Sequence, residues 1–370
     1  MLAWGLACSR PVPAPTWTDP AAASALVLVS HEPTDAEARF LSVSLADGAV
    51  AERGSLPALP YPNWDDHYEV VAAGDGDLWA AAVPSGEGTA LRIHGPGKDT
   101  RTVAMPRRPS ALTRVHDTLL VGAENTVAAI DLRAEVPAAE TVLERQDMSG
   151  KAFDRFARDG DWLIAVDDIV VPIYADLFQV DPRGKPMHLS GLELPGVING
   201  TYDLVQLKQD RPGTGTLFAL APYHVMSGRG HSLAALPIRG NTLRVPEQMI
   251  LNSRRHTDPP VTEEHVSHDN SQDLWAGSDY SPVGGMARLG DRLLLAAGPR
   301  GVFSMPLDLD TDSVQVVDVK GSAVDVRVVG ETAWVLVTSD GSGALQALSA
   351  DLSAGVRHPL PRACTGILDE

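Results

Sequence analysis

The sequence predicts an all-β protein, a seven-bladed β-propeller with a long loop insertion between blades 5 and 6. Short apolar runs bounded by Gly, Asp, Asn and Pro recur along the 370 residues, and no long segment keeps an apolar period of 3.6 residues. Seven runs follow a short turn, and 41 residues separate Leu78 from Leu119 while 44 separate Leu119 from Leu163. A period of about 40–45 residues that holds four strands is typical of a propeller blade. The seven runs are Ala25–Ser30, Asp77–Ala82, Thr118–Gly122, Asp161–Val166, Thr216–Leu220, Arg292–Ala296 and Thr332–Val337.

Each run belongs to a unit of four expected strands. Gly-Asp pairs between the first two strands supply the positive φ that tight hairpin turns need. In the second unit we expect strands at Tyr68–Ala73, Leu78–Val83, Ala90–His94 and Thr100–Met105, and in the sixth at Gly285–Leu289, Leu293–Ala297, Val302–Leu307 and Val314–Val319. The seven blades then cover roughly 21–60, 61–107, 108–147, 148–195, 196–252, 283–320 and 321–362. The alternative is a β-sandwich or two smaller β domains, which would not require equal spacing through both halves.

The expected organisation is an N-terminal segment, 1–20, followed by a single propeller domain, 21–370, with residues 253–282 inserted as a loop. The stretches Leu294–Val302 (LLAAGPRGV) and Leu163–Asp168 (LIAVDD) resemble bacterial β-propellers with degenerate repeats, of the LVIVD or YVTN kind. The double-glycine signature of kelch repeats is missing, and Trp64-Asp65 lacks the Gly-His partner of WD repeats.

Cys8 has two interpretations. Residues 2–7 (LAWGLA) and the Pro-rich stretch 9–15 that follows Cys8 resemble the end of a bacterial lipoprotein signal, in which the cysteine is lipidated. That resemblance implies a lipid anchor through Cys8 and an extracytoplasmic location, in the periplasm or on the cell surface. The other interpretation is an ordinary N-terminal tail. A disulfide between Cys8 and Cys364, the only two cysteines, is a further expectation if the fold brings the ends together.

The charge balance limits the classes of partner that the protein is expected to bind. With 48 acidic and 30 basic residues the formal charge is −18, which repels phosphate backbones and predicts no nucleic-acid binding. The sequence contains no apolar run of about 18 residues, so no transmembrane span is predicted. A GxSxG elbow, a Walker loop and a CxxC motif are all absent from the sequence, so covalent catalysis has no motif to support it.

The strand connectivity of a propeller predicts on which face binding occurs. With strands named A to D from axis to rim, the A–B and C–D turns emerge on one face. The B–C loops and the blade-to-blade connections emerge on the other, here called the B–C face. Long loops on a rigid scaffold usually carry function. We expect all the long connections on the B–C face: His31–Glu37, Tyr61–Tyr68, Asp168–Asp176, Pro222–His231 and Ser253–Pro282.

Polar clusters in these connections supply the candidate ligand-binding residues. Asp66 and His67 could bind a ligand or cap a turn, and the segment from Asp168 to Tyr174 could wall an axial funnel or extend a hairpin. The basic cluster at Arg254–His256 could hold an anion or be a solvated surface. The full candidate set is Asp66, His67, Asp168, Tyr174, His224, His231, Arg254 and His256.

The densest cluster is Glu263–Asp269, in which imidazoles and carboxylates could ligate a divalent ion. The candidate metal ligands are Glu264, His265, His268 and Asp269, and a solvated polar loop is the alternative. No other cofactor is predicted. The preferred function is a non-enzymatic β-propeller of the bacterial cell envelope that binds a protein partner or small ligand at the B–C face. The alternative is a metal-dependent hydrolase, lactonase or lyase with its site at the mouth of the central channel. The oligomeric state is left open.

Overall fold

The computed structural model describes most of the chain between Ser24 and Leu368. The described ranges are 24–61, 66–75, 78–86, 88–95, 100–144, 153–167, 174–181, 184–193, 204–225, 228–244, 284–309 and 313–368. Their regular secondary structure consists of β-strands. Within these ranges no helix is long and apolar enough to cross a membrane.

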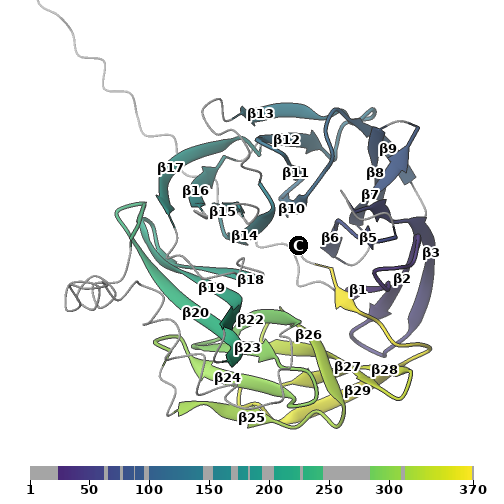
Figure 1. Ribbon diagram of the computed structural model, residues 1–370, viewed down its shortest axis with the longest axis vertical. Helices are drawn as coiled ribbons and strands as arrows, with labels where there is room; N and C mark the ends of the chain where they lie inside the picture. Colours follow the sequence, from purple (N-terminus) through teal and green to yellow (C-terminus); the bar gives the residue numbers. More distant parts are fainter. Residues whose placement is uncertain are drawn as a thin grey trace, which may run out of the picture.

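Seven four-stranded sheets stand around a central axis (Figure 1). Every sheet pairs its strands antiparallel, and six of the seven are formed by four consecutive strands. Each sheet presents its inner strand to the axis and its outer strand to the rim (Figure 1). The predicted seven-bladed β-propeller is therefore confirmed. A single blade would leave both faces of its sheet exposed, and only the ring of neighbours covers them.

The strands follow the predicted units closely. Blade 1 contains β1 (Ala25–Ser30), β2 (Glu37–Ser44) and β3 (Val50–Pro57); blade 2, β6 (Ala72–Asp75), β7 (Leu78–Ser85), β8 (Gly88–His94) and β9 (Thr100–Met105); blade 3, β10 (Ala111–Val115), β11 (Thr118–Ala123), β12 (Thr126–Asp131) and β13 (Glu140–Glu144); blade 4, β14 (Arg155–Asp159), β15 (Trp162–Asp167), β16 (Tyr174–Val180) and β17 (Pro186–Glu193). Blade 5 contains β18 (Leu204–Arg211), β19 (Thr214–Val225), β20 (Gly228–Arg239) and β21 (Thr242–Leu243); blade 6, β22 (Gly285–Leu289), β23 (Arg292–Ala296), β24 (Val302–Pro306) and β25 (Gln315–Val317); blade 7, β26 (Ser322–Val329), β27 (Thr332–Ser339), β28 (Ser342–Leu348) and β29 (Ala354–Leu360).

The core lies between the blades. Seven clusters of buried apolar side chains fill the seven blade interfaces, one cluster for each pair of neighbours. In β23, Leu293 and Leu295 pack toward blade 5, whereas Leu294 and Ala296 pack toward blade 7. Because both faces of the second strand of a blade are buried, its sequence is a continuous apolar run rather than an alternating one. The seven runs identified in the sequence all lie in second strands for this reason.

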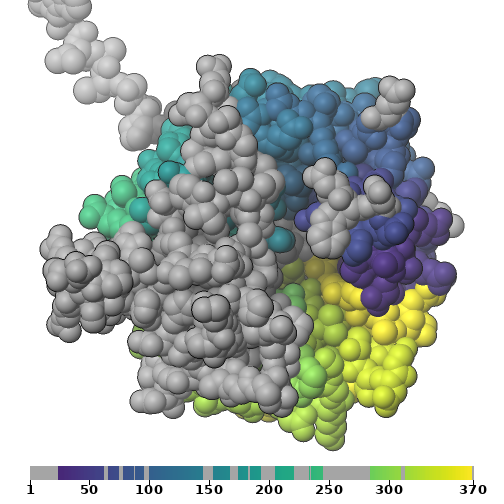
Figure 2. Space-filling model, in the orientation of Figure 1, coloured from purple at the N-terminus to yellow at the C-terminus, as the bar shows by residue number. Residues whose placement is uncertain are grey.

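The ring closes by combining the two ends of the described chain. The sheet of blade 1 has the order β3-β2-β1-β30, and its innermost strand, β30 (Gly366–Ile367), comes from the C-terminal end. Thr365 N donates to Val29 O at 2.8 Å and Leu368 N donates to Val27 O at 2.9 Å. Figure 2 shows the first and last blades side by side in purple and yellow. The expected first blade at 21–60 therefore lacks its inner strand, which only a distant segment supplies.

Two local expectations are wrong. The inner strand of blade 2 begins at Ala72 rather than Tyr68, because β5 (Tyr68–Glu69) pairs instead with β4 (Leu59–Pro60) in a small separate sheet. The expected loop Pro222–His231 is mostly strand. Its residues continue a long hairpin in which Pro222 lies opposite His231 and Val225 opposite Gly228. Strands of twelve residues can extend beyond the blade because their backbone groups pair with each other.

The strand connectivity of the blades places the A–B turns and the B–C connections on opposite faces, as expected. Consecutive strands are antiparallel, so the A–B turns leave one face while the B–C and blade-to-blade connections leave the other. The A–B turns are tight, and Gly290 and Gly330 adopt φ near 60° in them. In the third blade His116 takes the same conformation at φ 54°. Among the described residues, the connections at His31–Glu37 and Tyr61–Tyr68 therefore lie on the B–C face, whereas Ser253–Pro282 lies outside the described residues.

Candidate functional site

The first two of these connections contact each other on the B–C face. His31 lies in the B–C loop of blade 1, and its Nε2 is 2.9 Å from the carbonyl oxygen of Asp35. Tyr68 N donates to Pro33 O at 2.7 Å, which joins this loop to the connection between blades 1 and 2. In that connection Asp66 is exposed and His67 is partly buried, and the carbonyl of His67 accepts from Tyr61 N. Asp66 and His67 therefore lie on the predicted face.

Other candidate residues occupy strands instead of loops. Tyr174 is the first residue of β16, where it lies opposite Asp167 and Glu193. His224 lies opposite Arg229 near the tip of the β19–β20 hairpin. His231 lies further from the tip of the same hairpin, opposite Pro222. The sequence signal for a loop was misleading here, because Pro, Gly and Ser in 222–232 occur in a long hairpin.

The remaining candidates lie outside the described residues: Cys8, Asp168, Arg254, His256, Glu264, His265, His268 and Asp269. Among the described residues, no group of three or more His, Cys, Asp or Glu side chains is placed to hold a metal ion. The metal site therefore stays a prediction about residues 263–269.

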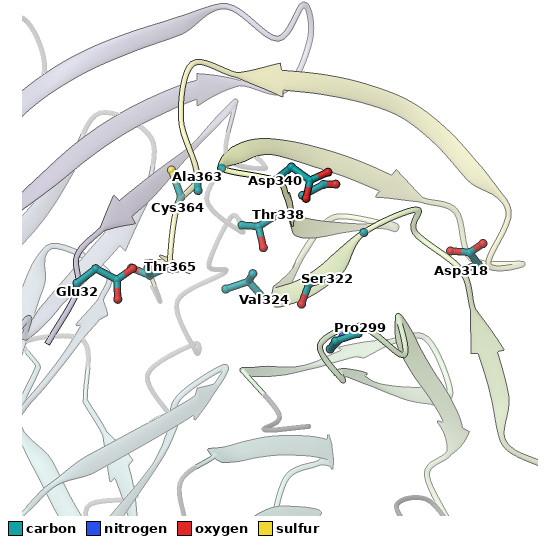
Figure 3. Close-up of a pocket in the computed structure, with 13 residues that line it drawn as sticks. Glu32, Pro299, Asp318, Ser322, Val324, Thr338, Asp340, Ala363, Cys364 and Thr365 are labelled. Carbon is teal, nitrogen blue, oxygen red and sulfur yellow. The ribbon is translucent and has the colours of Figure 1, made fainter. Parts of the chain in front are cut away.

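A pocket of about 680 Å³ opens on the B–C face between blades 6, 7 and 1. Its walls come from B–C turns, blade-to-blade connections and the adjoining ends of two strands. Figure 3 shows Glu32 and Asp318 at opposite sides of this space, with Ser322, Val324 and Thr338 between them. The thirteen lining residues are Glu32, Pro299, Asp318, Gly321, Ser322, Val324, Thr338, Ser339, Asp340, Gly341, Ala363, Cys364 and Thr365.

The lining of this pocket is acidic and hydroxylated. Glu32, Asp318 and Asp340 contribute carboxyl groups, and all three residues are exposed. Four further lining residues carry hydroxyls, and none of the thirteen is Lys, Arg or His. Two hydrogen bonds shape the edges. Asp318 accepts from Lys320 N at 2.8 Å, and Thr365 Oγ1 accepts from His31 N at 3.1 Å. Such a lining favours cationic or uncharged hydroxylated groups and disfavours phosphorylated ones.

Sequence reasoning missed this pocket, because no local pattern marks it. Its residues come from four separate stretches of chain: the loop at Glu32, the turn at Pro299, the segment from Asp318 to Gly341, and Ala363–Thr365. Ser339–Gly341 has the composition of an ordinary hairpin turn. Only the closure of the ring brings Glu32 beside Thr365.

Cys364 is one of the lining residues and is a buried free thiol, 1% exposed. Burial raises the pKa of this thiol to about 11, although Arg362 acts in the opposite direction. A thiol is reactive as its thiolate, so Cys364 is chemically protected in the folded protein.

We expect iodoacetamide to label Cys364 about a hundredfold more slowly in the native protein than in urea, since two pKa units separate the buried thiol from a free one. The rate is measured by mass spectrometry of the peptide that contains Cys364, with the urea-unfolded sample as the control. Equal rates in the two samples would contradict the buried position.

Comparisons with known proteins support the fold. No protein-family model matches the sequence, and no curated protein sequence matches it significantly. Three solved structures are similar at TM-scores of 0.50–0.52. A protein from Lactobacillus plantarum has a TM-score of 0.52 and 10% identity, over 94% of this chain and 99% of its own.

The other two structures are similar over comparable lengths. A candidate 6-phosphogluconolactonase from Bacteroides fragilis has a TM-score of 0.50 and 10% identity, over 93% of this chain and 97% of its own. Apo AztD from Citrobacter koseri has a TM-score of 0.50 and 8% identity, over 94% and 98%. At such identities the likeness concerns the fold alone, because one propeller scaffold hosts many functions.

Proposed function

We propose that the protein is a non-enzymatic binding propeller of the bacterial cell envelope that engages a protein partner or small ligand at its B–C face. The observation that carries the proposal is the pocket between blades 6, 7 and 1, which opens on that face. The absence of a catalytic motif from the sequence supports a binding role. The resemblance of residues 2–8 to a lipoprotein signal supports the extracytoplasmic location, and the LVIVD or YVTN kinship of the repeats is part of the same proposal.

The chemistry of the pocket defines the class of group it would accept. Three carboxyl groups without a basic neighbour in the lining suit a cationic or hydroxylated group on the partner, such as a lysine-rich segment, an amine or a sugar. The formal charge of −18 would attract a cationic partner from a distance. We therefore expect binding to weaken as salt screens the charges.

The proposal is tested by reversing one charge at the pocket. Glu32→Arg introduces a cation into the lining. The matched control, Glu331→Arg, makes the same change at an exposed turn on the opposite face of blade 7. Partners are recovered by cross-linking from the source organism, and their affinities are then measured with purified components. We expect Glu32→Arg to weaken binding about tenfold and Glu331→Arg to leave it unchanged.

Deletion of residues 253–282 provides the second arm of the test. If the insertion is the binding element, its removal abolishes recovery of the partners, whereas Glu32→Arg alone only weakens it. Partners that persist unchanged in both variants would overturn binding at the B–C face. The alternative function, a metal-dependent hydrolase, lactonase or lyase, requires a bound ion. It is tested by metal analysis of protein prepared with added divalent ions, and protein without a bound ion would exclude it.

A further inference from the structure

The turn between β27 and β28 contains an Asp-Gly pair, Asp340-Gly341, and both residues line the pocket (Figure 3). It is a tight turn, because Ser339 and Ser342 lie opposite each other at the ends of the two strands. Asp340 adopts a φ of 48° and Gly341 a φ of 78°, a combination that Asp and Gly tolerate in hairpin turns. Both residues are exposed, so the Asp340 carboxyl group and the next main-chain amide meet solvent together.

An Asp-Gly peptide can react with itself without a co-reactant other than water. The nitrogen of Gly341 attacks Cγ of the protonated Asp340 carboxyl group. An N–Cγ bond forms, and the carboxyl hydroxyl leaves with the amide proton as water, which closes a five-membered succinimide ring. Glycine favours this attack because no Cβ shields its nitrogen. Water then opens the ring at Cγ, which restores aspartate, or at the main-chain carbonyl, which gives isoaspartate.

Both reacting groups are free at Asp340-Gly341. Neither the Asp340 carboxyl group nor the Gly341 amide has a hydrogen-bond partner among the described residues. A Cβ on Gly341 would meet no atom within 4 Å, so the space around this peptide is open. The ends of the turn are held by strand pairing and by Ser342 Oγ, which donates to Ser339 O at 2.7 Å. The reaction therefore requires the rotation of one exposed peptide and no opening of the sheet.

A second pair, Asp47-Gly48, is protected in the C–D turn of blade 1. The nitrogen of Gly48 donates to Ser44 O at 2.9 Å, and Asp47 Oδ1 accepts from Ala49 N at 3.1 Å. Hydrogen bonds from Ser44 and Ala49 also hold the pKa of Asp47 below its usual value, whereas ring closure starts from the protonated acid. Both the nucleophile and the carbon that it would attack are thus engaged in this turn.

A third pair, Asp159-Gly160, is protected by contacts between blades. Asp159 Oδ2 accepts from Gln209 N of blade 5 at 2.8 Å and from Arg288 of blade 6 at 3.2 Å. These bonds have to break before the carboxyl group can turn toward the amide of Gly160. The fourth pair, Asp75-Gly76, includes a residue outside the described ranges. Of the three pairs that the structure describes, Asp340-Gly341 is the one in which both reacting groups are free.

We propose that Asp340-Gly341 is a site of spontaneous modification in the folded protein, at which a succinimide forms and reopens to isoaspartate. In the product the main chain runs through Cγ of residue 340 and is longer by one carbon atom. The pairing of Ser339 with Ser342 then changes, and one of the three carboxyl groups that line the pocket is displaced. Any effect on binding rests on the proposed function, whereas the modification itself does not.

The test follows the purified full chain during several weeks at physiological temperature and near-neutral pH. Peptides are separated and identified by mass spectrometry, and isoaspartate is detected by enzymatic methylation. We expect it to form about tenfold faster at residue 340 than at 47 or 159, because hydrogen bonds must first open at the latter two. In guanidinium chloride the three sites should react at similar rates. Equal rates at the three sites in the folded protein would overturn the proposal.

Two variants at the same turn separate the chemistry from the fold. Asp340→Glu is the matched control, since it keeps the charge but would have to close a less favourable six-membered ring, and we expect no isomerised product. Asp340→Asn suits the same turn and forms the same succinimide with loss of ammonia, so isoaspartate should appear faster than in the wild type. A stable Asp340→Asn protein without isoaspartate would refute the proposal. These measurements need no partner, so they stand or fall separately from the Glu32→Arg binding test.

Discussion

A chain shortened to end at Ala363 is expected to lose the closed ring. The truncation removes Cys364, Ile367 and Leu368, which are 1%, 5% and 7% exposed in the blade 7–blade 1 and blade 1–blade 2 interfaces. Burying side chains of this size contributes about 1.5–3 kcal/mol each, so the loss is about 5 kcal/mol. That is comparable with the whole stability of a typical folded domain, about 5–15 kcal/mol.

The truncation has a second consequence for β1. Without β30, the inner side of β1 becomes an unpaired edge, which favours association between chains. Unfolding in urea and gel filtration measure the two effects. The matched control removes only residues 369–370 and keeps β30, and we expect it to unfold as the full chain does. A truncated protein with an unchanged urea midpoint and a monomeric elution volume would show that β30 does not close the ring.

Gly284→Ala is expected to destabilise the protein by about 3 kcal/mol. A Cβ at this position would lie 1.7 Å from the carbonyl oxygen of Val324, in the inner strand of the next blade. A main-chain oxygen cannot rotate away as a side chain can, so the two inner strands would have to separate. Overpacking of this kind costs about 1–3 kcal/mol or more.

The matched control for this substitution is Gly88→Ala. Gly88 begins β8, its nearest neighbouring atom would be 3.8 Å from a new Cβ, and its φ lies outside the left-handed range. We expect a change within about 0.5 kcal/mol, measured for both variants by urea unfolding. Equal effects of the two substitutions would mean that blades 6 and 7 do not approach as closely as described.

Candidate site residues were predicted less well than the fold. The sequence predicted correctly on which face the described B–C and blade-to-blade connections emerge, because the number of strands per unit determines which connections share a face. It did not identify the pocket at Glu32, Asp318 and Asp340, since these residues are distant in the chain and belong to ordinary turns. It also took residues 222–231 for a loop, because the composition of a long hairpin tip resembles that of a loop.

The sequence by itself determined the repeated unit of this protein. Second strands such as β23 and β27 are buried on both faces, so their apolar runs stand out from the polar turns around them. Outer strands leave a weaker signal, and the expected strand Val314–Val319 is longer than the observed β25, Gln315–Val317. Spacing and strand count then led to seven blades without any knowledge of their contacts.

Only the tertiary structure decided how the ring closes and what that closure assembles. The pairing of Val29 with Gly366, the bond from Ile367 to Asp325 and the pocket between blades 6, 7 and 1 all join segments that lie far apart in the chain. Such contacts are selected by the geometry of a closed ring, in which the last strand must meet the first. Local sequence patterns report which surfaces are buried, but they do not report which distant segment covers them.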